Sequence, residues 1–123
     1  MIGENIMYQK HIIGKLGEDE ATKYLEQNGY KILDRNFSCK RGEIDIIALE
    51  KEEIVFIEIK SRTNKEYGLP REAVTKQKIN HILKTAEYYL YVRKLENLPV
   101  RIDVIEIFIR NNTIKINHLK QVV

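Results

Sequence analysis

Two apolar runs flank a short polar turn in residues 42–60, which read GEIDIIALEKEEIVFIEIK. Each run has the length and the isoleucine and valine content of a strand, and the polar residues 50–53 between them predict a tight reversal. A symmetric reversal centred on residues 51 and 52 fixes the antiparallel register: it sets Leu49 opposite Ile54, Ile47 opposite Phe56 and Asp45 opposite Glu58. Because side chains alternate along a strand, Asp45, Glu58 and Lys60 are expected on one face.

Carboxylates inside such apolar strands need a physical reason. Removing a carboxylate from water costs several kcal/mol unless a cation or good hydrogen bonds compensate. Asp45 and Glu58 at cross-strand distance could hold one Mg²⁺, and Lys60 could neutralise a phosphate or help to activate water. The alternative is ordinary cross-strand ion pairing, of Glu43 with Lys60 and of Asp45 with an arginine. A slip of one residue in the register would move Asp45 to the other face.

Length and composition indicate one globular domain. The chain has 123 residues, of which 43% are hydrophobic and 32% charged, and its net charge is +3. This mildly basic balance permits an anionic partner without requiring one. Cys39 is the single cysteine, so an intrachain disulfide is excluded, and the three histidines have no metal-ligand spacing. No apolar run could span a bilayer and residues 1–5 lack a signal-peptide layout, so we expect no membrane association and a cytoplasmic location.

The remaining chain predicts an α/β domain with the element order αβββαββ. The expected elements, besides the two central strands, are a loose tail over about 1–10, a helix over about 12–27, a strand at 30–34, a basic loop at 35–42, a helix over about 71–94, a strand at 100–109 and an edge strand at 113–119. The almost entirely apolar central strands are typical of a sheet covered on both faces. We therefore predict a mixed central sheet flanked by helices.

Several residues outside the two strands are further candidates for the site. Glu18 lies at the flank of the first helix's apolar face, where it could equally reach a metal or remain in solvent. Gly14 and Gly17 each cost about 1 kcal/mol relative to alanine in a helix, which indicates close approach of the sheet or of a ligand. The cations near the central strands could form a rim that attracts phosphate, although each could also be ordinary solvated surface: Arg35, Lys40, Arg41, Arg62, Lys65 and Arg71, with Lys76 and Gln77 at the start of the long helix. Asp103 is interpreted as an ion-pair partner of Arg101 or Arg71.

Three motifs in combination resemble one known family. They are Gly14-x-x-Gly17-Glu18-x-x-Ala21, then Gly42-Glu43-Ile44-Asp45, then Phe56-Ile57-Glu58-Ile59-Lys60-Ser61-Arg62. Together they resemble the YraN family of small, functionally uncharacterised bacterial proteins. That family is similar to the PD-(D/E)XK nuclease superfamily, and most closely to the archaeal Holliday-junction resolvases. The likeness runs from about Gly14 to Asp103, and Ile44 stands where the superfamily has a proline.

The resemblance implies a restriction-endonuclease-like fold and a catalytic role for four residues. Asp45 and Glu58 match the metal-binding carboxylates, Lys60 the active-site lysine and Glu18 the helix glutamate of resolvase-like members. The implied activity is hydrolysis of phosphodiesters in DNA, including branched DNA, with Mg²⁺ or Mn²⁺. DNA is favoured over RNA as the partner, and a two-fold homodimer is the implied assembly. The alternative is a nucleic-acid-binding module of the same fold with weak or no catalysis; a protein-interaction domain on the same scaffold is a further rival.

Overall fold

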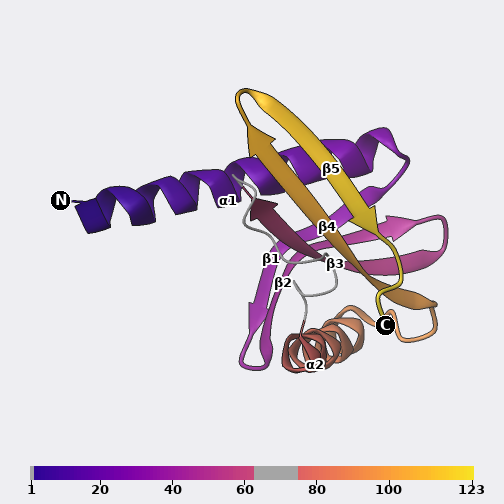
Figure 1. The fold of residues 1–123 in the computed structure, drawn as a ribbon. Helices are drawn as coiled ribbons and strands as arrows, with labels where there is room; N and C mark the ends of the chain where they lie inside the picture. Colours follow the sequence, from indigo (N-terminus) through magenta and orange to yellow (C-terminus); the bar gives the residue numbers. More distant parts are fainter. Residues whose placement is uncertain (1, 63–74) are drawn as a thin grey trace.

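A five-stranded sheet lies between two helices (Figure 1). The computed structural model describes residues 2–62 and 75–123. Its elements are, in chain order, α1 (Ile2–Gln27), β1 (Lys31–Cys39), β2 (Gly42–Glu50), β3 (Glu53–Arg62), α2 (Lys76–Arg93), β4 (Val100–Arg110) and β5 (Thr113–Leu119). This order, αβββαββ, and the α/β class confirm the prediction.

The strands follow one another across the sheet in the order of the chain. Neighbouring strands are antiparallel except β3 and β4, which are parallel. A parallel pair needs a long crossover connection, and α2 lies within the connection between β3 and β4. The sheet is therefore mixed, as predicted.

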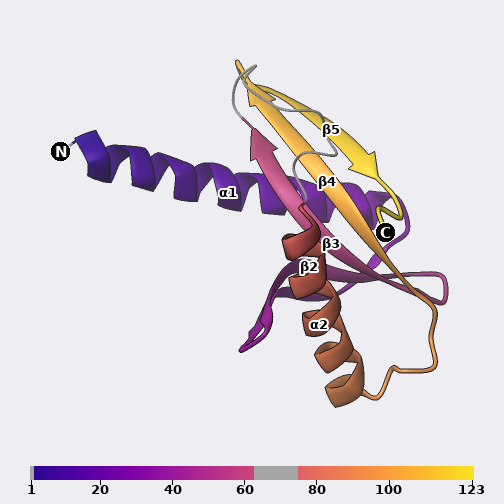
Figure 2. The ribbon, with the colours of Figure 1, turned by 60° about the horizontal axis from the view of Figure 1, so that its bottom comes forward.

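Each helix covers one face of the sheet, and alternation along the strands divides the core in two. Val55 and Ile57 of β3 pack with Ala21 and Leu25 of α1. The intervening residues of β3 pack instead against α2, as the second cluster shows: Ile54 and Phe56 with Ile82, Ala86 and Tyr89. Burial of β3 on both faces explains its almost entirely apolar sequence. Figures 1 and 2 show the N-terminal part of α1 running out beyond the strands.

Three element boundaries differ from the prediction. The loose tail over residues 1–10 is wrong for the described part, because α1 begins at Ile2; no proline or glycine interrupts residues 4–13. The loop at 35–42 is also wrong, since β1 continues to Cys39 in register with β2. The second helix begins at Lys76, because Thr75 is extended and its side chain caps the helix by accepting a hydrogen bond from the Lys78 N–H.

Candidate active site

The hairpin of β2 and β3 has the predicted register. Ile47 pairs with Phe56 and Leu49 with Ile54, and the turn lies at residues 51 and 52. The paired region ends at Ile46 and Ile57, one step before Asp45 and Glu58. The two carboxylates therefore lie on adjacent antiparallel strands, at the point where the strands cease to pair.

Simple alternation of side chains fails at Asp45. Ile46 belongs to the core cluster under α1, whereas Ile44 and Ile47 both belong to the cluster under α2, so the pattern breaks between Ile44 and Ile46. Asn36, which the register sets opposite Asp45, has a positive φ of 54°. Asparagine tolerates this left-handed conformation better than most residues. The expectation that Asp45 shares the face of Ile47 by regular alternation therefore does not hold.

Asp45 lies instead at the edge of β3. Its Oδ2 accepts a hydrogen bond of 2.8 Å from the backbone N–H of Ile59. Burial is the main cause that raises the pKa of Asp45 to about 6, and the charge of Glu58 adds to it. The Ile59 N–H and the charge of Lys78 act in the opposite direction. Asp45 is thus a partly buried carboxylate with a second acid near it.

Glu58 is buried and has two lysine partners. Its side chain is 6% exposed, and its Oε1 lies 3.6 Å from Lys60 Nζ and 3.5 Å from Lys78 Nζ. Lys60 was expected here, but Lys78 was not among the predicted site residues. Lys78 stands in the first turn of α2, and only the packing of that helix on the sheet brings it to β3. The sequence signal for it was weak: a Thr75 cap three residues earlier.

Glu18 of α1 is hydrogen-bonded to two side chains of β1. Its Oε1 accepts hydrogen bonds from Arg35 Nε at 2.9 Å and from Asn36 Nδ2 at 2.8 Å. Arg35 also donates to Asp19 at 2.7 Å, and this bond lowers the pKa of Asp19. Arg35 is therefore an anchor for the α1 acids in this structure, and Asn36 is a site residue that the sequence analysis did not identify.

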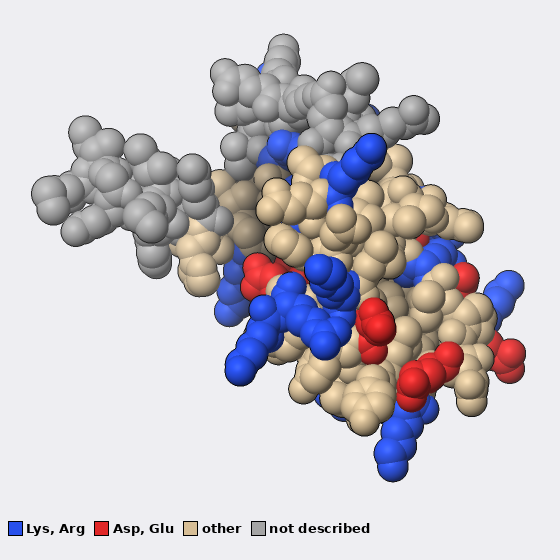
Figure 3. Space-filling model, turned by 90° about the horizontal axis from the view of Figure 1, so that it is seen from below, with Lys and Arg blue, Asp and Glu red and all other residues tan. Residues whose placement is uncertain are grey.

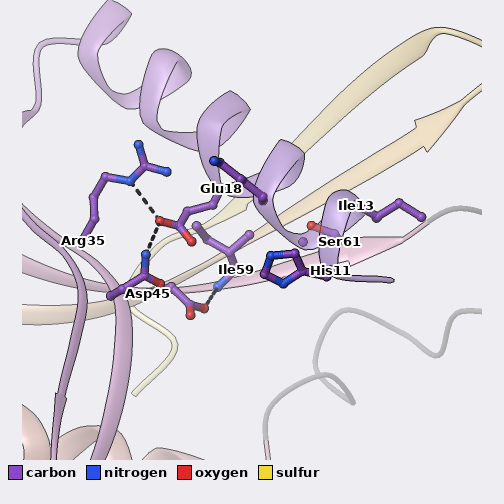
Figure 4. A pocket seen from close by; sticks show the side chains of 10 residues that line it. His11, Ile13, Glu18, Arg35, Asp45, Ile59 and Ser61 are labelled. Atoms are coloured by element: carbon purple, nitrogen blue, oxygen red, sulfur yellow. Dashed lines mark hydrogen bonds and ion pairs between the residues drawn. The ribbon is translucent and has the colours of Figure 1, made fainter. Parts of the chain in front are cut away.

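A hollow of about 890 Å³ lies beside Asp45, between α1 and the sheet. Figure 4 shows Glu18, Asp45, Ile59 and Ser61 around it, with His11 on α1. The residues that line it are His11, Ile13, Gly14, Lys15, Glu18, Arg35, Asn36, Asp45, Ile59 and Ser61. The hollow thus connects Asp45 and Glu18, whereas Glu58 is not among its lining residues and contacts Lys60 of β3 and Lys78 of α2.

The other predicted cations are dispersed. Lys40 and Arg41 form the exposed turn between β1 and β2, and Arg41 lines a smaller hollow with the C-terminal half of α2. Arg62, at the end of β3, is ion-paired with the buried Glu106 at 4.0 Å. Lys76 and Gln77 are exposed in the first turn of α2. Figure 3 shows Lys and Arg side chains gathered on the face seen from below, with acidic side chains beside them.

Two predicted cations, Lys65 and Arg71, lie outside the described residues. Within residues 2–62 and 75–123, no three His, Cys, Asp or Glu side chains are grouped as they would be around an ion. None of the helices in that part of the chain has the length and apolarity to cross a membrane. The arrangement is therefore a pair of neighbouring carboxylates, Asp45 and Glu58, with two lysines on Glu58 and a third acid, Glu18, across the hollow.

Comparison with known proteins gives the family. The model of the uncharacterised protein family UPF0102 matches residues 17–107. A UPF0102 protein of Clostridium perfringens strain SM101 is 53% identical over 95 residues, which cover 77% of this chain and 78% of the relative. A UPF0102 protein of Caldicellulosiruptor saccharolyticus is 42% identical over 113 residues, covering 90% and 96%.

A solved structure, that of Pyrococcus furiosus SfsA in complex with Ca²⁺, aligns with 90% of this chain and 63% of its own length. Its TM-score is 0.38 and its sequence identity 17%, a likeness too slight to bear on activity. The sequence matches are much stronger. They show that the chain belongs to the uncharacterised protein family UPF0102, the YraN family that its helix glycines and acidic strands resemble.

Proposed function

We propose that the protein is a metal-dependent nuclease that hydrolyses phosphodiester bonds in DNA. The observation that carries this proposal is the pair of neighbouring carboxylates, Asp45 and Glu58, on adjacent strands, with Lys60 two residues further along. Asp45 also borders a hollow that is open to a ligand. Two neighbouring carboxylates make each other's ionised form unfavourable, and a divalent cation between them would relieve this. The ammonium group beside them suits a phosphate.

The donor set fits Mg²⁺ or Mn²⁺. The raised pKa of Asp45 reflects burial and the charge of Glu58, and a cation would relieve both. Asp45 and Glu58 would hold the ion, and Glu18, which is hydrogen-bonded to Arg35 and Asn36, would assist directly or through water. When bound, such an ion lowers the pKa of water and stabilises negative charge on a phosphoryl group.

The chain's own groups would orient and balance the reacting phosphate. The Ile59 N–H fixes one oxygen of the Asp45 carboxylate, which leaves the other oxygen for a ligand. Lys60 and Lys78 both contact the same oxygen of Glu58, so two ammonium groups beside the carboxylate would be available to balance phosphate charge. Lys60 would balance charge on the scissile phosphate or orient the attacking water.

One observation favours a second candidate, a nucleic-acid-binding module without catalysis. Glu58 already has two lysine partners, so its charge is compensated without any metal. In that case the ion pairs of Glu58 with Lys60 and Lys78 would stabilise the fold. The two lysines would contact DNA phosphates without taking part in hydrolysis. The two candidates differ in whether Glu58 is needed for turnover or only for the fold.

A cleavage assay separates them. Purified protein is incubated with linear, single-stranded, flapped and four-way DNAs and with RNA, each with Mg²⁺, Mn²⁺ or a chelator. We expect metal-dependent cleavage that Glu58→Gln abolishes while DNA binding stays intact, and that Glu52→Gln, an exposed acid in the β2–β3 turn, leaves unchanged. Binding without cleavage of any substrate would replace the nuclease with the binding module.

Assembly belongs to the same proposal. A two-fold homodimer would set two such sites across a branched substrate. Sedimentation velocity of the protein alone and with four-way DNA measures the oligomeric state. A monomer under both conditions would contradict the homodimer.

A further inference from the structure

Two glycines of α1 stand in different surroundings. A Cβ at Gly17 would collide with Oγ of Ser61 on β3, so close packing of helix and sheet explains this glycine. A Cβ at Gly14 would meet nothing within 4 Å. Glycine inside a helix destabilises it by about 1 kcal/mol relative to alanine. Close packing among the described residues does not explain why glycine stands at position 14.

Gly14 does, however, line the hollow beside Asp45. The absence of a side chain there leaves the helix backbone accessible on the wall of the hollow. Glycine is the residue found where a ligand approaches the backbone closely. The hollow and the unexplained glycine are thus two separate observations that point to an occupant.

The lining describes the chemistry of that occupant. His11 and Lys15 supply cationic or hydrogen-bonding groups suited to phosphate, and Ile13 and Ile59 supply apolar surface. Arg35 also lines the hollow, but its guanidinium is already paired with Glu18 and Asp19. A volume of about 890 Å³ lies in the range that encloses a small organic molecule, and a nucleotide is of that size, whereas a double helix is far larger. Apolar surface inside such a space suits an unpaired base, because the bases of a duplex are stacked in its interior.

We infer that this hollow receives unpaired nucleotides next to the phosphate that reaches Asp45, so that the substrate class is a nucleic acid with a single-stranded segment. The inference rests on the proposed nuclease function and narrows it. A phosphate contacts Lys15, a sugar or base lies against Ile13 and Ile59, and Gly14 permits the close approach. Continuous duplex meets only the rim.

The test compares the affinities of a single-stranded DNA and a duplex of equal length, by fluorescence anisotropy in a chelator so that no cleavage occurs. Gly14→Leu places a bulky side chain at the wall of the hollow, and Gln27→Leu adds the same side chain to an exposed position of α1 that does not line it. We expect Gly14→Leu to weaken single-strand binding by about tenfold or more, which is the scale of losing contact with one base. Duplex binding and both affinities of Gln27→Leu should stay at the wild-type values.

A second pair of variants covers the case in which Gly14→Leu does not fold. Lys15→Gln removes a cation from the hollow, and Lys23→Gln removes an exposed one from the same helix outside it. Only Lys15→Gln should weaken single-strand binding preferentially and flatten its salt dependence, by about 0.7 in the log–log slope per lost phosphate contact. Equal weakening of single-strand and duplex binding, or no change in either, overturns the inference.

These outcomes are independent of the cleavage assay. If the wild type cleaves DNA while Gly14→Leu and Lys15→Gln bind single strands normally, the nuclease stands and the hollow is not its substrate channel. If nothing is cleaved but both variants lose single-strand affinity, the nuclease fails and the hollow is a single-strand-binding site. Repeating the measurement with single-stranded RNA of the same sequence shows which sugar the site accepts.

Discussion

The carboxylate of Asp45 is partly buried beside a second acid, and both conditions make its charge unfavourable. Its pKa is raised from the ordinary 3.8 to about 6, first by burial and then by Glu58. Because the folded pKa lies above the unfolded one, Asp45 contributes stability that is fully present below about pH 4. That contribution is lost as the pH rises through about 6. Above that pH, ionised Asp45 opposes folding.

The raised pKa of Asp45 predicts a stability effect of unusual sign. Asp45→Asn, which keeps an oxygen to accept the Ile59 N–H, should be more stable than the wild type above pH 6 in a chelator, by up to about 3 kcal/mol. The difference should shrink to near zero below about pH 4. Urea denaturation of both proteins across this pH range measures it, with Glu52→Gln as the control. A variant less stable than the wild type at neutral pH would contradict the raised pKa.

The residues themselves were partly predictable. Asp45, Glu58 and Lys60 were identified because charged side chains inside apolar strands are conspicuous in a sequence. Lys78 and Asn36 were not, because nothing local distinguishes a lysine in the first turn of a helix or an asparagine in a polar segment. Their roles arise only when α2 and β1 are packed on the central hairpin.

Helix α1 contains two glycines, one turn apart, whose surroundings differ. Gly17 packs against Ser61 of β3, whereas Gly14 borders open space. Gly14→Leu should therefore keep or raise the melting temperature, since leucine is favoured over glycine in a helix by several tenths of a kcal/mol or more. Gly17→Leu should lower stability by about 1–3 kcal/mol or more, because the larger side chain must separate α1 from β3.

Thermal unfolding followed by circular dichroism measures both variants. Equal effects of the two substitutions would contradict the distinct surroundings of the glycines.

The register of the central hairpin was predictable because its turn is short and polar and its apolar runs are symmetric about it. The length of β1 was not predictable from the sequence, since residues 35–39 are mostly polar and become a strand only by pairing with β2. Local sequence is a weak guide where tertiary pairing decides.

A buried hydrogen-bond network joins the C-terminal segment to the sheet. Asp103 is fully buried and accepts hydrogen bonds from Arg101, from the backbone N–H of Gln121 and at 2.7 Å from His118 Nε2. His118 Nδ1 in turn lies 2.9 Å from the Tyr24 hydroxyl of α1. The pairing of Asp103 with Arg101 confirms the interpretation from the sequence, but the roles of His118 and Tyr24 depend on contacts far apart in the chain.

Burial works to raise the pKa of Asp103, but the hydrogen bonds from His118, Arg101 and Gln121 hold it below its ordinary value. The stability that ionised Asp103 contributes is therefore present above about pH 4 and is lost as the pH falls through the lowered pKa. Asp103→Asn should cost about 1.5–3 kcal/mol at neutral pH, because it removes the buried charged acceptor from Arg101 and His118 while Glu50 and Glu53 still pair with Arg101. The difference in the free energy of unfolding between the wild type and Asp103→Asn should become smaller at acidic pH. Urea denaturation at neutral and acidic pH checks this, and a constant difference would contradict it.

Calorimetric titration of the protein with Mn²⁺ measures whether Asp45 and Glu58 together hold a divalent ion. The wild type and Glu52→Gln should bind Mn²⁺ with the same affinity. Asp45→Asn and Glu58→Gln should each weaken binding by at least about tenfold, since each removes a charged ligand. Wild-type affinity in both variants, or no saturable binding by the wild type, would show that these two carboxylates do not hold the ion.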